Sequence, residues 1–324
     1  MTADQALRLS AGQTLRALSE IDLLELVAHR LTTADNVPLA PVLRPGAADG
    51  WPAGRTGVSE TAVEDPGTGA VALLPTATLR MIWAAGLAGL ASRLLVAPGV
   101  ATAAVFGSGV ELGLQVAVLA RYLPALGHVT VPRVPAKRPG AGAPDVREQL
   151  DLAGIGLSAV GDPRRAALGA NLLVLTASAG GAEGIGPPAP GALVVNAAGR
   201  DLPGQVLDRI DRVYVDDLAL IAGNQQRDFL RARPAGREAP PLLRNREGWY
   251  RPEAGPRARL VEGDLGGVLD GADRGRASEE EVLLAELLGA AAVDAALAWR
   301  LWQSAAQCGL GRWVRIGGAR GGNE

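Results

Sequence analysis

The sequence predicts an α/β fold in which a doubly wound parallel sheet carries helices on both faces. Two observations support this. Short apolar runs alternate with helical or loop segments after about residue 100, which is the order found in parallel sheets. A glycine turn at 107–109 joins the first of these runs to a helix. The chain has 324 residues, 48% of them hydrophobic, which suffices for two domains with a sizeable core.

The elements before this region are predicted from periodicity and from turn residues. Apolar residues recur at helical spacing over 5–32, which indicates one or two amphipathic helices. Pro and Gly are frequent over 36–70, and AspProGlyThrGly at 65–69 is a turn signal between two strand-like runs. The helical period over 78–95 has few breakers and predicts one long helix.

After this helix, a strand at 102–106 opens the parallel sheet. Further strands are predicted over 129–131, 172–176, 192–196 and 213–215. Residues 231–259 are rich in Arg and Pro and are expected to form a long exposed loop. Ser278 and Glu281 form a capping box, which predicts a helix from there to about Gln307.

The run ThrAlaAlaValPheGlySerGlyValGlu at 102–111 is the main functional signal. It predicts a strand that turns into a helix, an arrangement that binds the pyrophosphate of a dinucleotide. Gly107 would permit the tight turn, and Gly109 would let the backbone approach the phosphates. Leu112 stands where the third small residue of such a fingerprint would fall. A glycine-rich turn that binds no ligand is the alternative.

Composition argues against several classes of function. A net charge of −2 gives no indication of nucleic-acid or membrane binding. With His29, His128 and Cys308 as the only residues of their types, an intrachain disulfide is impossible and a metal site is not expected. Both histidines are expected to be surface or packing residues. The apolar stretch 94–110 contains Pro98 and is not expected to span a membrane. With no visible signal peptide, we expect a cytoplasmic protein.

Several motifs along the chain follow one another in a familiar order. They are LeuArgMetIleTrpAlaAlaGlyLeuAla at 79–88, ThrAlaSer at 176–178, AsnAlaAlaGlyArgAspLeuProGly at 196–204, ValTyrValAspAsp at 213–217, and the glycine-containing motifs between 265 and 294. Together with the glycine turn, their order resembles that of the ornithine cyclodeaminase/mu-crystallin family over most of the chain.

The resemblance implies a Rossmann-type sheet together with a second α+β domain built from both chain ends. Residues 99–284 would form the dinucleotide-binding Rossmann domain. Residues 1–98 with 285–324 would form the substrate and dimerisation domain, which pairs subunits into a homodimer in the family. Cofactor and substrate would meet in the cleft between the two domains.

The resemblance also implies roles for individual residues. Arg80 would bind the carboxylate of an amino-acid-like substrate, and Asp201 would handle the protons of the substrate nitrogen as the catalytic residue. The residues expected to contact the cofactor are Gly107, Ser108, Gly109, Val110, Glu111, Thr176, Ala177, Ser178 and Asp294. The alternatives are a surface ion pair for Arg80, a turn residue for Asp201 and an exposed helix residue for Asp294. Trp83 is expected to pack in the core.

Some positions depart from the family pattern. No lysine precedes Lys137, although the family supplies one near the substrate carboxylate. Met81 stands in place of a threonine, and Gln205 in place of a lysine. Such a site is not expected to bind free ornithine in the usual way. Asp216 and Asp217 are expected to be solvated residues at a strand end.

The second strand of the Rossmann unit indicates which cofactor is bound. NAD-binding folds place an acidic residue at its end, where it contacts the ribose hydroxyls. Here the strand ends at Arg133, with Lys137 and Arg138 close behind. These cations would attract a 2′-phosphate, so we expect NADP(H) rather than NAD(H). A basic loop without a ligand is the alternative.

These inferences predict an NAD(P)H-dependent oxidoreductase that acts on the C=N or C–N bond of an amino-acid-like substrate. It would be an imine or ketimine reductase or an opine-type dehydrogenase, and its substrate could be a small molecule or part of a peptide. A redox-neutral amino-acid cyclodeaminase is one alternative. The other is a catalytically degenerate binding partner, for which the lost polar groups and the loop with Trp249 and Tyr250 argue.

Overall fold

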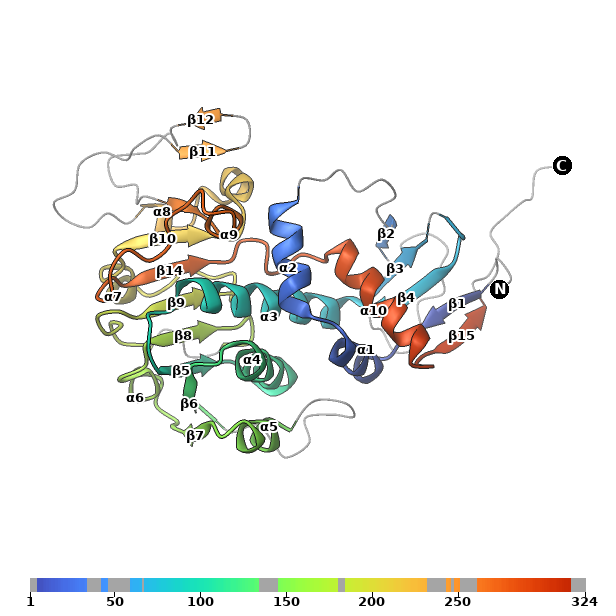
Figure 1. Ribbon diagram of the computed structural model, residues 1–324, viewed down its shortest axis with the longest axis horizontal. Coiled ribbons are helices and arrows are strands. Elements are labelled where there is room, and N and C mark those ends of the chain that lie inside the picture. Colours follow the sequence, from blue (N-terminus) through green and yellow to red (C-terminus); the bar gives the residue numbers. More distant parts are fainter. Residues whose placement is uncertain are drawn as a thin grey trace.

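The computed structural model contains two large sheets, which share one long helix, and a separate two-stranded hairpin (Figure 1). The residues that it describes are 5–33, 42–45, 59–65, 67–133, 145–179, 184–231, 243–245, 248–250 and 261–315. The statements below apply to these ranges. Of 42–45, 231, 243–245 and 248–250 the structure describes only the backbone.

The larger sheet has eight strands in the order β13-β10-β14-β9-β8-β5-β6-β7, and every neighbouring pair is parallel. Its strands are β5 (Ala101–Phe106), β6 (Leu126–Val131), β7 (Gly156–Ala159), β8 (Leu172–Leu175), β9 (Leu193–Asn196), β10 (Arg212–Val215), β13 (Val261–Asp264) and β14 (Leu283–Glu286). The chain runs outward from β5 through β6 to β7 and then returns to β8 on the other side of β5. This reversal confirms the doubly wound, Rossmann-type sheet.

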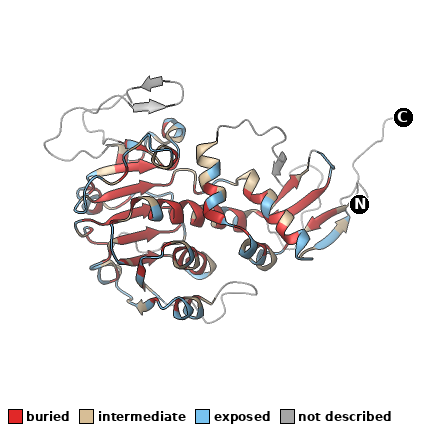
Figure 2. Ribbon diagram, in the orientation of Figure 1, coloured by how far each residue is buried: buried red, intermediate tan, exposed pale blue. Residues whose placement is uncertain are grey.

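Helices cover both faces of this sheet. They are α3 (Thr76–Leu95), α4 (Gly109–Tyr122), α5 (Val146–Leu152), α6 (Pro163–Ala167), α7 (Gly204–Leu207), the 3-10 helix η3 (Leu218–Asn224), α8 (Asp228–Arg231) and α9 (Leu265–Leu269). Successive strand residues face opposite sides. On β5, Ala103 and Val105 join the core under α3 and α4, whereas Ala104 and Phe106 join the core on the other face. The inner strands β5, β8, β9, β10 and β14 are buried along most of their length, whereas the edge strands β7 and β13 are more exposed (Figure 2).

The smaller sheet is mixed and is built from both ends of the chain (Figure 1). Its five strands lie in the order β15-β1-β4-β3-β2. They are β1 (Gln5–Arg8), β2 (Val42–Pro45), β3 (Glu60–Glu64), β4 (Val71–Pro75) and β15 (Arg312–Arg315). Its helices are α1 (Ala11–Ala17), the 3-10 helix η1 (Leu18–Glu20), α2 (Leu23–Thr32) and α10 (Ala295–Gln307).

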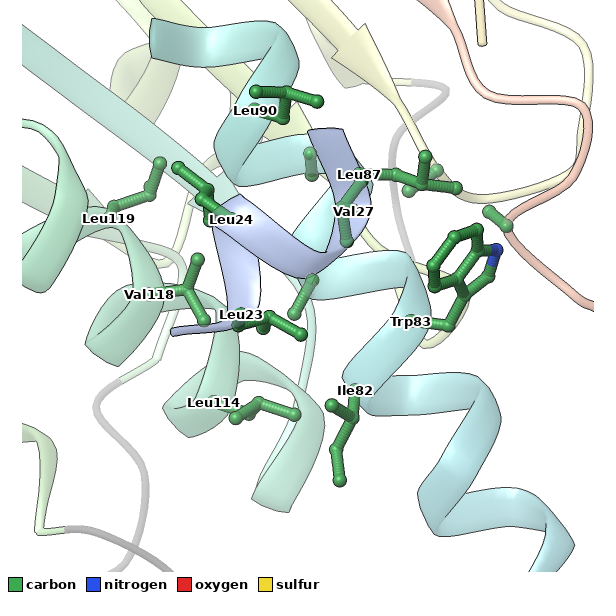
Figure 3. Packing of buried hydrophobic residues seen from close by; sticks show 14 of the residues in the cluster. Leu23, Leu24, Val27, Ile82, Trp83, Leu87, Leu90, Leu114, Val118 and Leu119 are labelled. Atoms are coloured by element: carbon green, nitrogen blue, oxygen red, sulfur yellow. The ribbon is translucent and has the colours of Figure 1, made fainter. Parts of the chain in front are cut away.

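Helix α3 connects the two halves of the molecule. It follows β4 of the smaller sheet directly, packs along the larger sheet and ends just before β5. Helix α2 crosses it, and its Leu23, Leu24 and Val27 fill the space between α3 and α4 (Figure 3). Two glycines on α3 make this close approach possible. A Cβ at Gly86 would lie 2.8 Å from Cγ2 of Val27, and one at Gly89 would lie 2.6 Å from Cγ1 of Val118.

We therefore expect Gly89→Ala to destabilise the protein. The overpacking against the stiff Val118 side chain costs about 1–3 kcal/mol, which exceeds the gain in helix propensity of about 1 kcal/mol. Urea denaturation would measure the free energy of unfolding. Gly223→Ala in η3 is the matched control, because no atom lies within 4 Å of its added Cβ. A Gly89→Ala protein as stable as the wild type would contradict this packing.

Three predictions about elements need correction. Glu281 accepts hydrogen bonds from the backbone of Ala277 and Ser278, but no helix follows. The next element is strand β14, and α10 begins only at Ala295. The start of the predicted helical region 5–32 is strand β1. Within the predicted loop 231–259, β11 (Leu243–Asn245) and β12 (Gly248–Tyr250) pair as an antiparallel hairpin.

The structure also contains strands β7 and β13, which the sequence did not predict. The domain boundaries at 98/99 and 284/285 stay a prediction, and the second of them falls within β14. Among the described helices, none combines the length and the apolar character that a membrane span requires.

Candidate functional site

The carboxyl ends of the parallel strands meet at one edge of the larger sheet. Phe106, Leu175, Asn196 and Glu286 lie side by side on β5, β8, β9 and β14. The glycine turn, the ThrAlaSer motif and the loop with Asp201 therefore follow neighbouring strands at the same edge. This edge faces the smaller sheet in Figure 1. Ligands of doubly wound folds bind here, next to the reversal between β5 and β8.

The two glycines of the turn serve different purposes from those that the sequence predicts. Gly109, the first residue of α4, has a φ of +58° and open space where a Cβ would be. Gly107 is needed because a Cβ there would lie 2.4 Å from Oγ1 of Thr176. Gly109 therefore provides the tight turn. Gly107 is required because the Thr176 side chain packs closely against its Cα.

The turn leaves several backbone donors available. Ser108 N donates to Ser178 Oγ over 2.9 Å. No described residue accepts a hydrogen bond from the N–H groups of Gly109, Val110 and Glu111 at the start of α4. Free N–H groups at a helix N-terminus suit a phosphate group.

Glu111 connects the turn to the ThrAlaSer motif. One of its carboxylate oxygens accepts from Ala177 N over 3.0 Å, and the other accepts from Ser178 N over 2.8 Å. Thr176 Oγ1 lies 3.2 Å from Ser178 Oγ. The structure thus brings the predicted cofactor residues after β5 and β8 together in one hydrogen-bonded unit.

Asp201 lies at the wall of a pocket of about 190 Å³ at this edge. The pocket is lined by Leu175, Ala179, Asn196, Ala198, Arg200, Asp201, Leu202 and Pro203. The Asp201 side chain is 41% exposed. Its Oδ1 accepts from Arg227 Nε over 2.8 Å and from Asp228 N over 3.0 Å. No described residue donates to Oδ2, so this oxygen is available to a ligand.

A buried polar group lies behind Asp201. Glu286 at the end of β14 is 1% exposed and accepts hydrogen bonds from Asn196 and from Arg227. Burial raises the pKa of Glu286 to about 8, although Arg227 and Asn196 act in the opposite direction. Asn196 also donates to the carbonyl oxygen of Arg200 over 2.8 Å. No sequence motif pointed to Glu286, because the helix predicted from Ser278 onward extended over it.

Asp216 is buried, so the expectation that it is solvated is wrong. Its two oxygens accept from Leu288 N and Gly289 N, each over 2.7 Å. A Cβ at Gly289 would lie 2.6 Å from Oδ2 of Asp216. Burial raises the pKa of Asp216 to about 6, and the two N–H donors act against this rise. Asp216 thereby fixes the segment that leaves β14 toward α10. Asp217 is exposed, as expected for a residue at a strand end, and its side chain caps η3.

Arg80 is exposed on α3, and no described residue pairs with it. Its position along the helix follows from geometry. Helix α3 ends at Leu95 and β5 begins six residues later at Ala101, so the end of α3 lies near the amino edge of the larger sheet. At 1.5 Å per residue, Arg80 lies about 22 Å back along the helix axis. A six-residue strand such as β5 spans about 20 Å. Arg80 is therefore level with the carboxyl edge, the same end as Asp201.

The remaining predicted residues lie farther out or have other partners. Arg133 is exposed just after β6, whereas Lys137 and Arg138 lie outside the described residues. Asp294 is the N-cap of α10: its Oδ1 accepts from Leu297 N over 2.8 Å and its Oδ2 from Arg30 Nε over 3.0 Å. With both oxygens engaged, Asp294 connects α10 to α2. Its contact with a cofactor stays a prediction.

The other residues singled out in the sequence are accounted for by packing or hydrogen bonds. Trp83 is buried in the core under α2. His128 lies 3.0 Å from Ser158 Oγ, and His29 lies 3.2 Å from Thr33 Oγ1. Gln205 Nε2 donates to the carbonyl oxygen of Ile185 over 2.7 Å. In the described part of the chain, no three His, Cys, Asp or Glu side chains gather as metal ligands would.

The burial of Glu286 predicts a pH-dependent stability. A folded-state pKa above the unfolded value means that the folded protein retains a proton that the unfolded chain releases. The contribution of Glu286 is then fully present below pH 4.5, its unfolded value, and is lost as pH rises toward about 8. We expect the free energy of unfolding of Glu286→Gln, relative to the wild type, to rise over this window by up to about 1.4 kcal/mol per pH unit.

Denaturant unfolding at several pH values would measure this difference. Glu148→Gln is the control for the loss of one negative charge, since Glu148 is exposed on α5. Parallel stability curves for Glu286→Gln and the wild type would contradict the prediction.

Comparison with known proteins finds similarity in structure. No family model matches the sequence, and no curated protein matches it. Among solved structures, CmnK superposes with a TM-score of 0.64 at 20% identity, covering 98% of this chain and 100% of that one. Δ1-Pyrroline-2-carboxylate reductase from Thermococcus litoralis, in complex with NADH and L-proline, gives 0.60 at 16% identity over 94% and 99%.

A lysine cyclodeaminase, described with its recognition of L-lysine, L-ornithine and L-2,4-diaminobutyric acid, gives a TM-score of 0.59 at 19% identity, over 97% of this chain and 96% of that one. These likenesses extend over both sheets and nearly the full length of each chain. The protein therefore has the fold that pyrroline-2-carboxylate reductase and lysine cyclodeaminase share, which bears out, for the fold, the resemblance seen in the motif order.

Proposed function

We propose that the protein is a nicotinamide-dependent oxidoreductase that acts on the C=N or C–N bond of an amino-acid-like substrate. The observation that carries the proposal is the position of Asp201. One of its oxygens is fixed by two donors, the other is unengaged, and the side chain lines a pocket at the carboxyl edge of the larger sheet. In an imine or ketimine reductase or an opine-type dehydrogenase, such a carboxyl group could exchange a proton with the substrate nitrogen.

The residues at the turn fit a dinucleotide. The N–H groups of Gly109, Val110 and Glu111 could donate to its phosphates, and Glu111 holds the segment 176–178 in place beside them. A nicotinamide cofactor bound here would supply a hydride to the imine carbon or accept one from the amine carbon. The similar fold of a reductase described in complex with NADH supports this assignment.

The chain's own residues would then position the substrate and handle its proton. Arg80 would bind the substrate carboxylate, because its guanidinium has no described partner and is level with the site. Reduction places a hydride on carbon and a proton on nitrogen, and Asp201 Oδ2 would give that proton. In the oxidative direction the same oxygen would accept it.

We also propose NADP(H) as the preferred cofactor, because Arg133 stands exposed at the end of β6. The homodimer and the cytoplasmic location remain predictions.

Calorimetric titration with NADPH and NADH tests the cofactor. We expect tighter binding of NADPH, and we expect Arg133→Gln to weaken it about tenfold while leaving NADH unchanged, since one charge-assisted hydrogen bond to phosphate is lost. Arg147→Gln on α5 is the matched control, because Arg147 is also exposed. Tighter binding of NADH by the wild type would contradict the preference, and binding of neither would favour a degenerate binding partner.

Turnover with a panel of cyclic imino acids, and of 2-oxo acids with amines, tests the reaction. We expect NADPH consumption, and a drop in kcat/KM of about 10²- to 10⁴-fold for Asp201→Asn, because a general acid is lost. Asp208→Asn, at the exposed end of α7, is the control. Release of ammonia from L-ornithine or L-lysine without net change in the cofactor would instead identify a cyclodeaminase.

A further inference from the structure

Arg227 lies between two carboxylates at the candidate site. Its Nε donates to Oδ1 of Asp201 over 2.8 Å, and its Nη2 donates to Glu286 and, over 2.7 Å, to the carbonyl oxygen of Arg200. We propose that Arg227 is the positioning residue of the reaction, which orients Asp201 so that Oδ2 faces the substrate nitrogen. This inference rests on the function proposed above.

The guanidinium itself is firmly held. Arg227 is 8% exposed, and its Cζ lies 6.0 Å from the centre of the Phe229 ring. Its backbone N donates to Asn224 O over 3.0 Å, and its carbonyl oxygen accepts from Leu230 N over 3.1 Å. Phe229 is buried in the core on the same face of the sheet as Phe106. Few rotamers are therefore open to Arg227.

Glu286 supplies the second fixed point. It stands on β14, in the middle of the larger sheet, and its other oxygen accepts from Asn196 Nδ2 over 2.8 Å. Because Arg227 Nη2 donates to this fixed carboxyl group, Glu286 keeps Arg227 where it can reach Asp201. These hydrogen bonds thereby connect the loop that carries Asp201 to the two inner strands β9 and β14.

The two carboxylate oxygens of Asp201 have different roles. Oδ1 accepts two hydrogen bonds, from Arg227 Nε and from Asp228 N, which fix the plane of the carboxyl group. The loop that carries Asp201 is held in place as well, because both Asn196 and Arg227 donate to the carbonyl oxygen of Arg200. Oδ2 remains for the substrate. A lysine could not replace the planar fork of Arg227, since its single ammonium cannot match these directions.

Steady-state kinetics of Arg227→Gln and Arg227→Lys on an imine that the wild type reduces tests this role. We expect kcat to fall about 10- to 100-fold in both variants, as misplacement of a reacting group does, with KM for the imine within about twofold and the affinity for NADPH unchanged. The solvent deuterium isotope effect on kcat should rise, because proton transfer becomes slower. Arg227→Lys retains the charge beside Glu286 and guards against loss of folding.

Arg212→Gln is the matched control. Arg212 is also a partly buried arginine between two glutamates, with Nε 3.8 Å from Glu262 and 3.1 Å from Glu281, but it stands at the start of β10, at the opposite edge of the sheet. The Arg212→Gln variant should be less stable than the wild type, with kcat and the solvent isotope effect unchanged.

A double-mutant comparison shows whether Arg227 acts through Asp201. In the Asp201→Asn background, Arg227→Lys should lower kcat no further, whereas a merely structural role would add its loss. A wild type that reduces an imine while Arg227→Gln and Arg227→Lys keep its kcat and isotope effect would overturn the inference alone. A wild type that binds NADPH but reduces no imine would overturn the proposed function, and the inference with it.

Discussion

The parallel direction of the eight strands in the larger sheet is the constraint on which the site depends. Because all strands end at one edge, residues far apart in sequence meet there. Asn196 and Glu286 are 90 residues apart and yet occupy neighbouring positions with a direct hydrogen bond. An antiparallel sheet would divide these polar residues between two edges.

The second constraint is the cost of placing charge in this edge. Glu286 and Asp216 are nearly free of solvent, and each compensates its lost hydration with two or more donors. Both buried carboxyl groups lie where the chain leaves β14 and runs toward α10. Such a concentration of buried, partnered carboxylates is more typical of a functional site than of a stabilising core.

Much of the fold was predictable, because its signals are local. The run at 102–111 contains the turn glycines and the buried strand in one stretch, and the structure has β5, the turn and α4 there. Glu286 was not predictable from such signals. LeuLeuAlaGlu is as compatible with a helix as with a buried strand, and the preceding capping residues favoured the helix. Glu281 makes its capping hydrogen bonds although no helix follows. Leu283 and Leu284 are instead buried in the sheet, as part of β14.

The candidate site was predictable only where a motif or a resemblance named the residue. Asp201 and Arg80 came from the motif order; the structure puts Asp201 at the carboxyl edge, and Arg80 is exposed near the start of α3. Arg227 lies 26 residues from one partner and 59 from the other, and nothing in its neighbourhood distinguishes it from other arginines. Asp216 appeared to be a solvated strand end because its partners, Leu288 N and Gly289 N, are backbone groups with no sequence signature.

A crystal structure of the protein with bound NADPH would test the central claim most directly. We expect phosphate oxygens on the N–H groups that begin α4, the 2′-phosphate near Arg133, and the nicotinamide ring between Asp201 and Arg80. A dinucleotide bound elsewhere, or a ring whose reactive carbon faces away from Asp201 Oδ2, would contradict it.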